Sequence, residues 1–140
     1  MRVNLILFSA VVLWGVWGLA NKFAVDRAHP FSVQWMFSVP FALSIPLFYW
    51  LGARAAPTTN LEPTALFWTL VASLASLLAT VLLFFALQER QASVAMAVTS
   101  AYPLVTLVLA VLLHKESLSL PKVAGILFLV IGLVLLQVAD

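Results

Sequence analysis

The sequence predicts an all-α membrane protein that is a bundle of five transmembrane helices. Hydrophobic residues make up 64% of the 140 residues and charged residues only 9%, whereas a soluble domain usually carries about 25% charged residues. The charges divide the chain into five uncharged stretches, and four of them reach the roughly 20 apolar residues that a helix needs to cross a bilayer. Consecutive apolar positions, as from Val81 to Phe85, favour helices over barrel strands, which alternate apolar and polar residues.

Charge and cysteine content exclude several classes of function. The net charge is only +2 and the cations are scattered, so we expect no nucleic-acid partner. The chain has no cysteine, which excludes disulfides, thiolate metal ligands and cysteine nucleophiles. We expect no metal and no cofactor, and the lipid bilayer is the partner that the composition indicates.

The five helices are expected near residues 3–22, 31–52, 64–88, 92–114 and 121–139. The first stretch, in which Arg2 precedes an apolar run, could instead be a secretory signal. A membrane span is the better interpretation, because Lys22 follows directly, no small-residue cleavage site stands where expected and four more spans follow.

Prolines mark the irregular helices. Pro40 and Pro46 fall inside the second helix and Pro103 inside the fourth, where each removes a backbone hydrogen bond and bends the helix. Carbonyls freed at membrane depth are tolerated where they are buried in protein or line a cavity. A kink that only improves packing is the alternative. Pro121 can open the fifth helix at its first turn.

Short connections predict antiparallel neighbours, and five spans place the two ends of the chain on opposite sides. Four cations lie on the side of the first residue and three on the other: Arg2, Arg54, Lys115 and Lys122 against Lys22, Arg27 and Arg90. This excess of one weakly favours a cytoplasmic N-terminus, and it permits insertion in both orientations.

Uncharged polar and deep aromatic side chains follow helical spacing inside three spans. The third span carries four hydroxyls at offsets of 4, 7 and 11 from Thr69, which places them on one face. Such hydroxyls commonly bond their own backbone or allow close helix packing, while a deep tryptophan needs a partner for its indole N–H. The candidate pathway residues are Trp14, Trp17, Asn21, Ser73, Ser76, Thr80, Thr99, Tyr102 and Pro103.

The fifth span is apolar except for Gln137, and its small residues leave a surface that another helix can approach closely. We take Gly125 and Gly132 as candidate helix-packing residues. This helix is expected to face lipid or a partner chain rather than a cavity.

The later part of the chain resembles the EamA domain of the drug/metabolite transporter superfamily. The resemblance lies in Tyr102-Pro103-Leu-Val-Thr, Leu113-His-Lys-Glu116, Lys122-Val-Ala-Gly125 and Ile131-Gly132, with Trp14-Gly15 in the first helix. It implies half of a ten-helix inverted-repeat fold, here as one EamA-like transmembrane domain over 1–140, similar to the single-domain five-helix branch of bacteria and archaea. Many relatives carry an arginine in the second helix, whereas Met36 to Ser38 occupy that region here.

The resemblance implies a transporter of small metabolites or drug-like molecules in a prokaryotic plasma (inner) membrane, as a multi-pass protein. It also implies a homodimer, in an antiparallel arrangement, that works by alternating access. A non-transporting membrane accessory or structural subunit is the alternative. An enzyme is disfavoured, because no carboxylate, histidine or lysine lies at mid-membrane and His29 and His114 stand beside loops.

Overall fold

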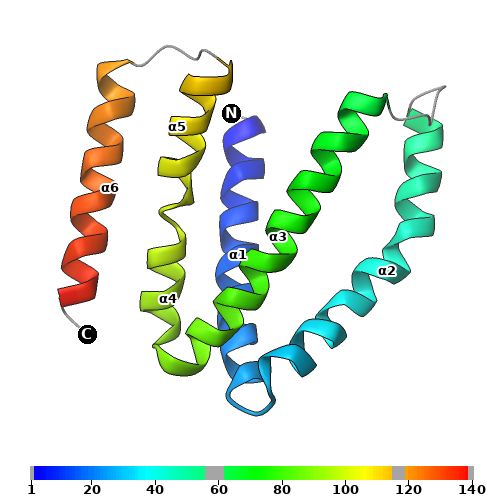
Figure 1. The fold of residues 1–140 in the computed structure, drawn as a ribbon, viewed down its shortest axis with the longest axis horizontal. Coiled ribbons are helices and arrows are strands. Elements are labelled where there is room, and N and C mark those ends of the chain that lie inside the picture. The colour runs from blue at the N-terminus through cyan, green and yellow to red at the C-terminus, as the bar shows by residue number, and fades with distance from the viewer. Residues whose placement is uncertain (1, 56–61, 115–118, 139–140) are drawn as a thin grey trace. The chain divides into compact units, whose positions relative to one another are not determined.

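The computed structural model describes residues 2–55, 62–114 and 119–138, which are almost entirely helical and contain no strand. Six helical segments follow one another: α1 (Arg2–Val25), α2 (Pro30–Ala55), α3 (Pro63–Glu89), α4 (Ala92–Thr99), α5 (Tyr102–His114) and α6 (Leu120–Val138) (Figure 1). The segments α4 and α5 together form the fourth expected span, so the predicted all-α fold with five spans is confirmed.

Four stretches are long and apolar enough to cross a membrane, judged by length and composition: Val3–Val25, Pro30–Ala55, Pro63–Glu89 and Ala92–Leu113. The fifth, Leu120–Leu136, is a shorter apolar helix, in line with its expected length. The chain divides into two compact units, Met1–Gln88 and Glu89–Asp140, and each is described below by itself.

Helix α1 runs to Val25, one turn beyond the expected end at residue 22. Lys22 does not stop the helix, because its ammonium group has partners. It lies 2.8 Å from the Asp26 carboxylate and donates to the Leu87 carbonyl of α3 at 2.6 Å. A charge that is paired and hydrogen-bonded can remain inside a helix near the membrane boundary.

Helix α2 begins at Pro30, where the missing N–H of proline is not needed. His29 caps it: its carbonyl accepts from the Val33 N–H at 3.1 Å, and its Nδ1 accepts from the Phe31 N–H at 3.3 Å. The helix continues past Gly52 to Ala55, beyond the expected end at residue 52. It also continues through Pro40 and Pro46, and Figure 1 shows it changing direction along its length, as expected.

The fourth span is interrupted at Ser100 and Ala101 instead of being one helix over 92–114. Pro103 has no N–H for the Thr99 carbonyl. The preceding turn tightens, since the Ala101 N–H donates to the Val98 carbonyl at 3.1 Å and the Leu104 N–H to the Ala101 carbonyl at 2.9 Å. Pro103 therefore lies in the first turn of a new helix, α5.

Buried side chains of the first unit gather where α1 ends, α2 begins and α3 ends. We call this region the anchored end, and its buried members are Val25, Pro30, Val33, Leu83, Phe84 and Leu87. Phe84 and Leu87 are 0% exposed. Most other side chains of the three helices are exposed, which suits surfaces that contact lipid or another chain.

Candidate functional site

An aromatic groove of about 470 Å³ lies in the first unit. Its walls come from all three helices: α1 supplies one leucine and two tryptophans, α2 two phenylalanines and α3 two hydroxyl residues. The lining residues are Leu13, Trp14, Trp17, Phe37, Phe41, Ser76 and Thr80. Four of them are candidate pathway residues from the sequence, so the structure brings part of the predicted set together.

The aromatic rings of this groove pack on one another at an incline. The ring centroids of Trp17 and Phe37 are 6.0 Å apart at 58°, and those of Phe37 and Phe41 are 5.0 Å apart at 55°. Phe37 also meets the buried Phe84 edge-on at 5.9 Å. These tilted pairs are favourable aromatic geometry, and they connect the groove to the anchored end.

The polar groups of the lining residues are the hydroxyls of Ser76 and Thr80, which can accept, and the indoles of Trp14 and Trp17, which can only donate. The Thr80 hydroxyl donates to the Ser76 carbonyl at 2.8 Å, so its hydrogen is engaged and its oxygen remains an acceptor. Across the described chain, the buried side-chain atom without a hydrogen-bond partner is Gln34 Oε1, which is not among the groove residues.

Among the residues that the structure describes, no ionisable side chain lines the aromatic groove. An unpaired charge taken out of water costs several kcal/mol. A desolvated cation–π contact contributes about 2 kcal/mol or more against that cost, and the described lining has no carboxylate to add to it, while an anion gains nothing from the negative ring faces. The groove therefore favours an uncharged occupant over an ion of either sign.

Beside the groove, polar side chains join the ends of α1 and α3. Lys22 donates to the Leu87 carbonyl, and in return Gln88 Nε2 donates to the Val25 carbonyl at 3.1 Å. The last carbonyls of a helix have no amide partner within the helix, so each helix satisfies an open carbonyl of the other. We call this pair of bonds the reciprocal tie, and it holds the anchored end together.

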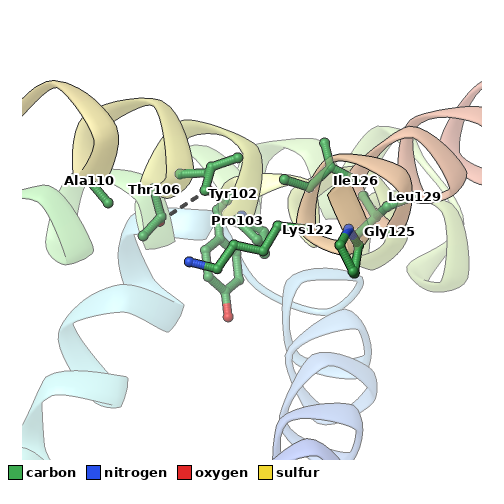
Figure 2. A pocket seen from close by; sticks show the side chains of 10 residues that line it. Tyr102, Pro103, Thr106, Ala110, Lys122, Gly125, Ile126 and Leu129 are labelled. Atoms are coloured by element: carbon green, nitrogen blue, oxygen red, sulfur yellow. Dashed lines mark hydrogen bonds between the residues drawn. The ribbon is translucent and has the colours of Figure 1, made fainter. Parts of the chain in front are cut away.

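A second groove, of about 460 Å³, lies in the second unit between α5 and α6. Figure 2 shows the side chains that line it. It runs along α5 from Tyr102 to Ala110 and along α6 from Pro121 to Leu129. The Thr106 hydroxyl donates to the Tyr102 carbonyl at 3.2 Å, the bond drawn in Figure 2. Lys122, in the first turn of α6, gives this groove a cationic side chain that the first groove lacks.

The remaining candidates from the sequence lie elsewhere. Asn21 is buried and donates to the Trp17 carbonyl of its own helix at 2.9 Å. Ser73 donates to the Thr69 carbonyl, and Thr99 donates to carbonyls of α4, and neither lines a groove. These hydroxyls follow the local backbone bonding that the sequence left open as the alternative.

The two glycines of α6 differ. Gly125 lines the second groove beside Pro103, whereas Gly132 does not. A Cβ placed on either glycine would meet nothing within 4 Å. Both positions therefore have open space where a side chain would begin.

The sequence did not single out Phe37 and Phe41 of the first groove or Lys122 of the second. Phe37 and Phe41 are four residues apart, which places them on one helix face. That spacing was visible in the sequence. It did not stand out, because almost every neighbouring position in this span is also apolar.

Comparison with known proteins is consistent with this architecture. The model of the EamA-like transporter family matches residues 1–138. An uncharacterized protein of Methanocaldococcus jannaschii is 31% identical over 73 residues, which is 52% of this chain and 53% of the relative, so the match spans about half the length of each. No solved structure matches the chain.

A set of membrane-length helices with a groove among them defines an integral, multi-pass membrane protein. The chain belongs to the EamA-like transporter family, a family of membrane transporters within the drug/metabolite superfamily. The resemblance noted in the sequence is thereby confirmed.

Proposed function

We propose that this protein transports small metabolites or drug-like molecules across a prokaryotic plasma (inner) membrane. The observation that carries the proposal is the aromatic groove, because it gathers ring faces, two hydroxyls and two indoles from three membrane-length helices. A concave, mostly apolar site with a few polar groups is typical of small-molecule binding. Family membership supports the same function.

Transport is proposed to need two copies of the chain. The helices bury little against one another: the apolar windows of the four longer spans are 6%, 0%, 17% and 0% buried within the chain. Three helices leave the aromatic groove open, and a second copy would supply the missing wall. Alternating access would then be a rocking of one copy against the other about this site.

The two copies are proposed to insert antiparallel. Four cations against three on the two sides permit either orientation. The chain has no cysteine, so Asp140→Cys, at a position outside the described residues, creates one label site. We expect a membrane-impermeant maleimide to label about half of the protein in intact cells. Labelling of all or none would reject dual insertion and favour a parallel homodimer or a partner protein.

Reconstitution tests the transport function itself. Purified protein is screened by thermal shift against amino acids, amines, nucleosides and sugars, and stabilising compounds are then measured for uptake into proteoliposomes. Trp14→Leu should reduce uptake at least tenfold, because Trp14 lines the groove. Trp35→Leu is the matched control, since Trp35 is 61% exposed and Trp14 58%, but Trp35 does not line it.

The competing function is a membrane accessory or structural subunit that transports nothing by itself. Pure protein that is folded, yet moves none of the stabilising compounds, would favour that alternative. An equal loss of uptake in Trp14→Leu and Trp35→Leu would also contradict the groove as the transport site.

A further inference from the structure

We propose that the aromatic groove binds an uncharged aromatic molecule that carries a hydroxyl group, with a simple phenol as the model ligand. The proposal rests on the proposed function and names the substrate class of the same site. It follows from three properties of the lining residues: their charge, the arrangement of their rings and the division of their polar atoms.

Charge comes first. The seven residues that line the groove carry no ionisable side chain. As argued for the site, ring faces offset only part of the cost of an unpaired cation and none of the cost of an anion. An uncharged ligand avoids this cost altogether. The absence of charge in the wall therefore selects against amines and carboxylates that share the same ring.

The second property is the arrangement of the aromatic rings. Trp17, Phe37 and Phe41 form a chain of inclined rings with centroid separations of 6.0 and 5.0 Å. A further aromatic ring can join such a chain in the same tilted or edge-on geometry, which is the favoured one for aromatic pairs. An aliphatic ligand of equal size would gain contact area but not this edge-to-face attraction.

The third property is the set of hydrogen-bonding groups that the lining residues carry. Thr80 offers an acceptor oxygen, because its hydrogen is already donated to the Ser76 carbonyl. Trp14 and Trp17 offer indole N–H donors. A phenolic hydroxyl is both donor and acceptor at one atom, so it can satisfy groups of both kinds. A ring without a polar atom would leave these groups unpaired, which weakens binding.

Three probes with the same ring and different charge test the proposal: p-cresol, tyramine and 4-hydroxyphenylacetate at pH 7. Each is radiolabelled and measured by equilibrium dialysis against the full chain in lipid nanodiscs, with empty nanodiscs as the blank for partition into lipid. We expect saturable binding of p-cresol and at least tenfold weaker binding of both charged probes. Equal or tighter binding of either charged probe, or no saturable p-cresol binding, would overturn the proposal.

A matched pair of variants tests the polar contact. Thr80→Val removes one hydroxyl acceptor of the groove and leaves that of Ser76 in place, and we expect p-cresol affinity to fall about fivefold. Binding of p-xylene, which lacks the hydroxyl, should change less than twofold. Thr69→Val is the control, because the Thr69 hydroxyl also bonds its own helix, to the Ala65 carbonyl at 2.8 Å, but lies outside the groove. Equal losses of p-cresol affinity in both variants would contradict the role of Thr80.

This experiment can fail separately from the proposed function. Uptake of some other compound, with no saturable binding of p-cresol, would overturn the ligand class and leave transport standing. Saturable p-cresol binding without uptake of any compound would overturn the transport function and leave the ligand class standing. A circular dichroism spectrum of each variant confirms that it is folded, and the three-probe comparison on the unaltered chain needs no variant.

Discussion

In the first unit, side chains reach from one helix to another, whereas the hydroxyls of the second unit bond the backbone of their own helices. Lys22 and Gln88 exchange bonds between the ends of α1 and α3, and Phe84 packs edge-on against Phe37 of α2. In the second unit, Thr99, Ser100 and Thr106 donate to carbonyls three or four residues earlier. The first unit therefore has specific contacts that orient its helices.

The difference matters because lipid is as apolar as the helices. Apolar side chains gain little by leaving lipid for a neighbouring helix, so association depends on close packing and on hydrogen bonds between helices. The first unit uses both at its anchored end. The second unit offers small residues on α6, which let another helix approach closely. Three predictions test this contrast.

The largest effect is expected from Phe84→Ala, which removes a fully buried ring from the anchored end. The cavity should cost about 3 kcal/mol of stability, seen as a fall in the thermal unfolding midpoint in detergent. Phe67→Ala is the control, because Phe67 is 57% exposed on the same helix. If the unfolding midpoints of both variants fell equally, the anchored end would not be the core of this unit.

An intermediate effect is expected from Lys22→Met, which removes the ion pair with Asp26 and half of the reciprocal tie. A hydrogen bond from a charged group contributes about 1.5–3 kcal/mol, and the unfolding midpoint should fall accordingly. Arg27→Met removes the same charge from the same end of the unit. Its guanidinium donates to the Phe23 carbonyl of its own helix at 2.8 Å and lies 5.9 Å from the Phe23 ring centroid, so the unfolding midpoint of Arg27→Met should change little. A larger fall of the unfolding midpoint in Arg27→Met than in Lys22→Met would show that positive charge at this end, rather than the reciprocal tie, stabilises the unit.

The smallest effect on stability is expected from Gly132→Leu in the second unit. A Cβ there meets nothing within 4 Å, so the added side chain fits the isolated chain. We expect an unchanged unfolding midpoint but weaker chemical cross-linking between copies, because the surface open to another helix is filled. Val134→Leu, at a 53% exposed position two residues away, is the control. Cross-linking that persists in Gly132→Leu would exclude this surface as a contact between copies.

The sequence by itself determined that the chain is helical, that it has five apolar spans and approximately where each begins. Hydrophobic length and charge position control these features, because an unpaired backbone or an unpaired charge is costly in lipid. The sequence also indicated a disturbance at Pro103. Only the structure located the break at Ser100 and Ala101, because the tightened hydrogen bonds of that turn decide where the helix stops.

Sequence and structure agree on part of the groove lining, and its role in transport stays a proposal. Helical spacing correctly placed Ser76 and Thr80 on one face of α3 and Trp14 and Trp17 on one face of α1. It could not show that Ser73 and Asn21 lie outside the groove or that Phe37 and Phe41 belong to it. Periodicity identifies a face only where polar and apolar residues contrast. In spans that are apolar on every side, contacts such as Phe37 with Phe84 and Lys22 with Leu87 decide which way each helix turns.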